Sequence, residues 1–186
     1  FSADSDAKIT ISGGKITFDA KGDGLDSNGS LCVSGGEIFV TGPSDNGNGA
    51  LDYNGDAQIT GGTIVAVGMS GMTQNFGSSS TQGSILSNTA TNTSGEVVLK
   101  DSNGNVLVSF TPTREYNSVV VSTPDVKKGS TYTLTTGDSS TTIEMSDIIY
   151  GESTQGRAAN GGGQGGPNGR GQAPNGNMGG GFGNRP

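Results

Sequence analysis

The sequence predicts an all-β fold of the parallel β-helix type, with a C-terminal β-hairpin cap and a disordered Gly-rich tail. Glycine supplies 35 of the 186 residues and hydrophobic types only 29%, which disfavours a large helical core because glycine weakens helix interiors. A glycine-containing triplet recurs at spacings of 22 and 26 residues, and alternating apolar residues flank each copy. Such repeats are typical of short strands stacked in coils.

Each predicted coil contains short strands joined at glycine corners, where a positive φ is needed. The triplets are Ser-Gly-Gly at 12–14 and 34–36 and Thr-Gly-Gly at 60–62. A second motif places Leu25, Leu51 and Met72 in one inward column. An antiparallel sandwich with glycine-rich turns is the alternative. Several columns stay aligned through two changes in loop length, and this favours the β-helix.

Three segments follow from this pattern. Residues 1–94 are expected to form the coils, with a coil pattern that is already under way at the first residue. Residues 95–149 are expected to cap or flank them, with a hairpin at Asn103-Gly104 and further strands at 119–121, 132–134 and 143–145. Phe39, Val65 and Cys32 are expected to face outward, covered either by these strands or by a partner subunit. Residues 150–186, rich in Gly, Asn and Pro, are expected to be disordered.

Composition excludes several kinds of chemistry. The chain has no histidine, which removes the Ser-His-Asp triad and histidine bases, and its single cysteine, Cys32, is expected to be buried and inert. The net charge of −7 disfavours binding to nucleic acid phosphates. Because no run of 18 apolar residues occurs, we expect no membrane span.

The repeat register places Asp4, Asp26 and Asp52 in one column, with neighbouring carboxylates roughly 5 Å apart. Two such charges repel by about 3 kcal/mol at an effective dielectric near 20, so a cation between them is favoured. Ca²⁺ takes six to eight oxygen ligands. Further oxygens come from four nearby residues: Asp23, Asn28, Asn48 and Asn54. The alternative is that these Asp and Asn residues merely occupy turns.

These residues resemble a known family. The run Gly22–Gly29, the Ser-Gly-Gly-x-Ile strand starts, and residues 47–53 followed by 59–63 are similar to the calcium-containing carbohydrate-binding β-helix family. The resemblance covers roughly residues 1–137. It implies a right-handed parallel β-helix, similar in fold to pectate-type polysaccharide lyases, with bound Ca²⁺ and an extracellular or cell-surface location. By position, Asp26 and Asp52 are its strongest calcium candidates, followed by Asp23, Asp4 and Asn28.

The function expected is non-catalytic binding of plant cell-wall polysaccharides, which the family implies are acidic pectic sugars or cellulose. Bound Ca²⁺ could bridge the acidic protein to acidic sugars. Tyr53, outward in this register, is the candidate platform for a sugar face, and Lys21 is the nearest cation. A calcium-dependent lyase with Lys21 as its base is one alternative. A structural or adhesive surface protein that forms homo-oligomers through its open N-terminal coil edge is another.

Overall fold

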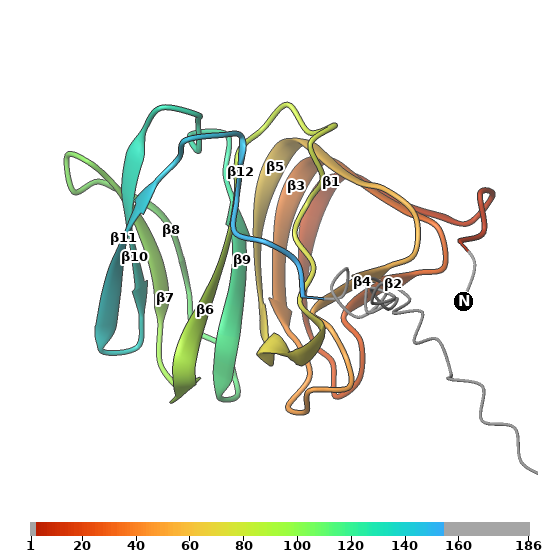
Figure 1. The fold of residues 1–186 in the computed structure, drawn as a ribbon, viewed down its shortest axis with the longest axis horizontal. Coiled ribbons are helices and arrows are strands. Elements are labelled where there is room, and N and C mark those ends of the chain that lie inside the picture. The colour runs from red at the N-terminus through yellow and green to blue at the C-terminus, as the bar shows by residue number, and fades with distance from the viewer. Residues whose placement is uncertain (1–2, 155–186) are drawn as a thin grey trace, which may run out of the picture.

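The computed structural model describes residues 3–154, which form three layers of β-sheet (Figure 1). The all-β class expected from the sequence is confirmed. A six-stranded sheet lies in the middle, a four-stranded antiparallel sheet lies on one side, and a two-stranded sheet lies on the other. The predicted disordered tail lies outside the described residues from residue 155 onward.

The N-terminal half forms a stack of coils, here called the coil stack, over residues 8–68. Its long strands are parallel neighbours in the six-stranded sheet: β1 (Lys8–Asp19), β3 (Ser30–Thr41) and β5 (Ala57–Gly68). Its short strands form the two-stranded parallel sheet: β2 (Leu25–Ser27) and β4 (Leu51–Tyr53). Ile9 pairs with Leu31, and Leu31 with Ala57, so the predicted spacings of 22 and 26 residues set the register.

Glycine is required at the coil corners for two separate reasons. The second glycine of each pair has a positive φ, 86° at Gly14, 94° at Gly36 and 88° at Gly62. The first glycine faces the preceding coil at close range. A Cβ on Gly35 would lie 2.6 Å from the carbonyl oxygen of Ser12, nearer than any side chain tolerates. Only glycine therefore lets the coils approach at these corners.

Residues 69–83 continue the coil path without a third copy of the short strand. A 3₁₀ turn, η1 (Ser70–Met72), replaces it. Met72, predicted to face inward, is only half-buried, and Phe76, with 2% of its surface exposed, fills the core instead. Asn75 is buried, and its side chain bonds to Tyr150 O at 2.8 Å. The predicted motif therefore aligns in sequence but not in the direction of its side chains.

The C-terminal half changes the sheet from parallel to mixed. β9 (Tyr116–Ser122) lies between β5 and β6 (Ser84–Thr93) and is antiparallel to both, and β12 (Ile149–Tyr150) adds a parallel edge. The sequence pattern predicted a purely parallel sheet. The central sheet is instead mixed, because β9 is antiparallel to both of its neighbours. The predicted boundary at residue 94 is also crossed, because β9 joins the sheet of the coil stack.

The other C-terminal strands form the antiparallel sheet in the order β11, β10, β7, β8. Their bounds are Val97–Asp101 for β7, Val106–Phe110 for β8, Thr131–Thr136 for β10 and Ser139–Glu144 for β11. The hairpin predicted at Asn103-Gly104 is confirmed between β7 and β8. Of the two arrangements expected, capping or flanking the coils, this sheet takes the second, because it packs on the outer face of the central sheet (Figure 1).

Two apolar cores result. One fills the coil stack and includes Leu31, Ile59 and Phe76. The other lies between the central and antiparallel sheets and includes Val65 and Val121. Phe39 stacks on Phe110 of β8, with ring centroids 5.2 Å apart. Of the two alternatives for Phe39 and Val65, cover by the C-terminal strands is therefore the one the structure shows. Cys32 is half-buried, so the prediction of a buried cysteine was wrong.

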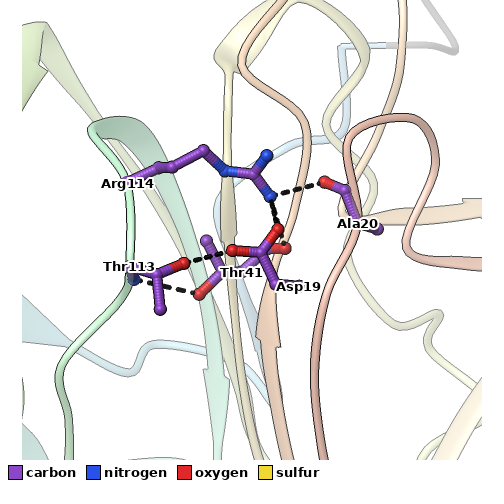
Figure 2. Close-up of polar contacts among 5 residues, drawn as sticks. All are labelled: Asp19, Ala20, Thr41, Thr113 and Arg114. Atoms are coloured by element: carbon purple, nitrogen blue, oxygen red, sulfur yellow. Dashed lines mark hydrogen bonds and ion pairs between the residues drawn. The ribbon is translucent and has the colours of Figure 1, made fainter.

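A polar clip fastens the C-terminal half to the coil stack (Figure 2). Arg114, in the loop after β8, donates from Nη2 to the Asp19 carboxylate and to Ala20 O at 2.8 Å. The neighbouring Thr113 donates from its hydroxyl to the other oxygen of Asp19 and from its N–H to Thr41 Oγ1 at 3.3 Å. The loop thus holds the ends of β1 and β3 together.

Candidate functional site

The two strongest sequence candidates, Asp26 and Asp52, are directly paired in the parallel β2–β4 ladder. Strands in such a ladder lie about 4.8 Å apart. The neighbouring Leu25 and Leu51 pack toward the coil core, so the two carboxylates project from the opposite face. Asp26 is exposed and Asp52 is half-buried. The predicted column of carboxylates is thus present for these two residues.

Glycine brings the two coils close at this site. A Cβ on Gly24 would lie 2.2 Å from Ala50 O, so no other residue fits without a shift of the backbone. Gly24 N donates to Gly49 O at 2.9 Å, and Leu25 N to Ala50 O at 3.1 Å. These contacts fix the height of Asp26 relative to Asp52.

Asp23 fastens adjacent coils. Its Oδ1 accepts a hydrogen bond from Gly49 N at 2.7 Å, and the carboxylate is half-buried. Asn48, on the same turn as Gly49, donates from its side chain to Asp45 at 2.9 Å. Asp23 therefore has a structural partner, and its second oxygen is the one left for another ligand.

Asp4 lies beside Asn28 and not level with Asp26. Asp4 N donates to Asn28 O at 2.8 Å, and Asp4 Oδ1 accepts from Asp6 N at 2.9 Å. Asn28 and Asn54 are exposed two residues beyond the paired aspartates. Among residues 3–154, no three or more His, Cys, Asp or Glu side chains gather closely enough to hold a metal ion on their own. Any cation here would depend on amide, backbone and water oxygens.

The register predicted that Tyr53 points outward. In the structure its side chain is instead partly buried. Its ring packs against the coil core, and its hydroxyl donates to Asn75 O at 2.5 Å. Gln74 bonds to the Tyr53 main chain on both sides, at 2.7 and 2.9 Å. Burial raises the pKa of Tyr53 to about 12, and the nearby charge of Asp56 adds to the effect. Little of the ring is left as a platform for a sugar.

Lys21 lies in the turn that follows β1 and is exposed. It forms no hydrogen bond or ion pair with another residue in 3–154. The structure therefore places Lys21 just before the acidic turn, as the sequence predicted, and leaves its ammonium group in solvent.

A groove on the antiparallel sheet was not predicted. It has a volume of about 450 Å³, and its lining includes Asp101, Asn105, Asp125, Lys127 and Tyr132. The Asp101 carboxylate accepts hydrogen bonds from the Asn105 side chain and from backbone N–H groups, which lowers its pKa. The aspartate and asparagines at 101–105 are visible in the sequence, but a hairpin turn accounts for them. Only the fold brings residues 125–132 beside it.

Comparisons with protein-family models, curated proteins and solved structures found no match to this chain. No helix in the described part of the chain is long and apolar enough to cross a membrane.

Proposed function

We propose that this protein is a non-catalytic, calcium-supported binder of acidic polysaccharides at the cell surface or outside the cell. We further propose that its coil stack is a right-handed parallel β-helix. The observation that carries the functional proposal is the in-register pairing of Asp26 with Asp52 on a solvent-facing side of the coils. Two carboxylates held this close attract a cation, because their repulsion falls when one binds.

The donor set fits Ca²⁺ better than other metals. Asp26 and Asp52 supply carboxylate oxygens, and Asn28 and Asn54 supply amide oxygens nearby. Ca²⁺ accepts this mixture together with waters, whereas zinc prefers the His and Cys ligands that are missing near these residues. With so few protein carboxylates, several coordination positions would remain for water or for the carboxylates of a sugar. A bound Ca²⁺ would there supply attraction between two negatively charged molecules.

Acidic sugars are favoured over neutral glucans such as cellulose. The chain carries a net charge of −7, so a polyanion needs a bridging cation to approach. Neutral sugar faces would need an exposed aromatic ring, but Tyr53 is held by the core and by Asn75. Cellulose binding therefore remains the weaker form of the proposal.

Lyase activity is less well supported. A lysine that acts as a base is usually desolvated by its surroundings. Lys21 is instead exposed on the coil surface. No other lysine lies as close to the acidic turn in the sequence.

The test is binding of polygalacturonate and of cellulose, each measured by calorimetry with Ca²⁺ and with EDTA. We expect polygalacturonate to bind with Ca²⁺ only. Asp26→Asn and Asp52→Asn should each weaken this binding at least tenfold. Asp138→Asn is the matched control, because it removes one exposed carboxylate from the distant turn between β10 and β11. Unchanged binding in EDTA would refute the calcium bridge, and the absorbance of unsaturated sugar would indicate a lyase.

A further inference from the structure

We propose that the groove on the antiparallel sheet is a second carbohydrate site, which binds oligosaccharides of amino sugars through their positively charged amines. The groove has a volume of about 450 Å³, and sites for small ligands usually measure roughly 300–1,000 Å³. It lies on a different sheet from the Asp26–Asp52 pair. This second site uses no calcium and does not depend on the site proposed above.

Tyr132 fixes one wall of the groove. Its side chain is buried, and its hydroxyl donates to Asp125 O at 2.7 Å and accepts from Lys127 N at 2.8 Å. The turn at 125–127 is thereby tied to β10. The Asp125 carboxylate and the Lys127 ammonium are exposed, and neither bonds to another residue in 3–154. Both groups can therefore meet a ligand without the loss of an existing contact.

Asp101, the last residue of β7, supplies a second carboxylate. Its Oδ1 accepts from Asn103 N at 2.9 Å and from Asn105 N at 2.8 Å, and its Oδ2 accepts from Asn105 Nδ2 at 2.8 Å. These bonds hold the carboxylate in one orientation and lower its pKa. Because a carboxylate has about four acceptor positions, one position on Oδ2 is left for a donor from a ligand.

The groove continues across the start of β10. A neighbouring hollow of about 230 Å³ shares Ser130 and Thr131 with it. This hollow adds Glu144 of β11, which pairs with Thr131, while Asp101 of β7 pairs with Tyr132 on the other side of β10. β7 and β11 are two strand spacings apart, which is about 10 Å. The carboxylates are therefore spread along a groove that can take more than one sugar ring.

This spread of carboxylates favours several ammonium groups over one metal ion. No three acidic side chains among residues 3–154 gather closely enough to hold a metal ion on their own. The lining carries more carboxylates than lysines, so its charge is negative and attracts cations. Hydrogen bonds from N⁺–H to a carboxylate are about twice as strong as neutral ones. A ligand with repeated amines can form such a bond at each carboxylate.

The rest of the lining favours a sugar over a simple polyamine. Ser102, Ser130 and Thr131 bring hydroxyl groups to the groove, and Lys127 is a donor. Sugar hydroxyls both donate and accept hydrogen bonds, so they match this mixture. The half-buried Leu107 adds an apolar surface for the C–H groups of a sugar ring.

The first test is calorimetry of the full chain in EDTA at pH 6, where carboxyl groups of ordinary pKa are ionised. The ligands are hexamers of glucosamine, of N-acetylglucosamine and of glucose with the same linkage, and a linear polyamine. We expect the glucosamine hexamer to bind at least tenfold more tightly than the others. Acetylation removes the charge and keeps the ring, so equal binding of a neutral hexamer would overturn the proposal. Equal binding of the polyamine, or no binding of the glucosamine hexamer, would overturn it as well.

The second test locates the site. Asp125→Asn should weaken binding of the glucosamine hexamer about tenfold, because a charge-assisted hydrogen bond becomes a neutral one. Asp138→Asn is the matched control, since it removes an exposed carboxylate from the turn at the opposite end of β10. An equal loss in both variants would indicate diffuse attraction by the net charge. That result would overturn the proposal, and so would an unchanged affinity of Asp125→Asn.

Glu144→Gln tests whether the ligand crosses β10. The side chain of Glu144 is exposed, so this variant should melt like the wild type. It should weaken binding of the glucosamine hexamer by several fold and leave binding of the glucosamine dimer unchanged at the Asp101 end. An unchanged affinity for the hexamer would overturn the extended groove.

Discussion

Replacement of Arg114 should separate the contribution of the polar clip from that of the two apolar cores. The Arg114–Asp19 pair is partly exposed, with 23% and 44% of the side chains accessible, so it is worth about 1 kcal/mol and not the several kcal/mol of a fully buried pair. The bond to Ala20 O at 2.8 Å is charge-assisted and adds about 1.5 kcal/mol. Arg114 Nε is buried without a hydrogen-bond partner among the described residues, which offsets part of this gain.

We therefore expect Arg114→Ala to lower the free energy of unfolding by about 2 kcal/mol, which corresponds to a Tm decrease of roughly 4–8 °C for a domain of this size. Urea unfolding followed by circular dichroism measures the change. A double-mutant cycle with Asp19→Ala isolates the ion pair, for which we expect a coupling of about 1 kcal/mol. Each variant is compared at one protein concentration.

Lys128→Ala is the matched control. It removes the Lys128–Asp147 ion pair, whose side chains are 63% and 69% exposed, and it should leave the midpoint unchanged. If Arg114→Ala behaves like this control, or if the cycle with Asp19 shows no coupling, the clip does not hold the two halves together. The apolar contacts of Phe39 with Phe110 would then be sufficient.

The remaining predictions concern the coil stack. Tyr53→Phe should flatten the loss of stability between pH 10 and 12. Because the pKa of Tyr53 is raised to about 12, its neutral hydroxyl stabilises the fold fully below pH 10, by at most about 3 kcal/mol. This stabilisation is lost as the pH rises through 12, and urea unfolding at alkaline pH measures the loss. Gly24→Ala should abolish cooperative melting because its Cβ would meet Ala50 O at 2.2 Å, whereas Gly22→Ala, with its nearest contact at 3.9 Å, should melt normally. Leu51→Ala, which truncates a side chain with 1% exposure, should cost about 2–5 kcal/mol in urea unfolding, and a cost below 1 kcal/mol would contradict its place in the core.

The coil stack could be predicted from sequence because its rules are local. Glycine corners and alternating apolar residues repeat at the same spacing as the ladder, so the pairing of Asp26 with Asp52 followed from counting residues. The position of β9 could not be predicted in this way. A valine-rich strand fits either a parallel or an antiparallel neighbour, and nothing within 119–121 specifies insertion between β5 and β6.

The direction of the side chains at the end of the coil stack could not be predicted from the repeat either. The third motif keeps an apolar residue and an asparagine at the matching positions, but η1 replaces the short strand, so Phe76 takes the core position predicted for Met72. The same segment brings Asn75 O to the hydroxyl of Tyr53. Tyr53, which would face outward in an ideal coil, is thus partly buried. Such changes depend on a loop whose conformation the periodic pattern does not encode.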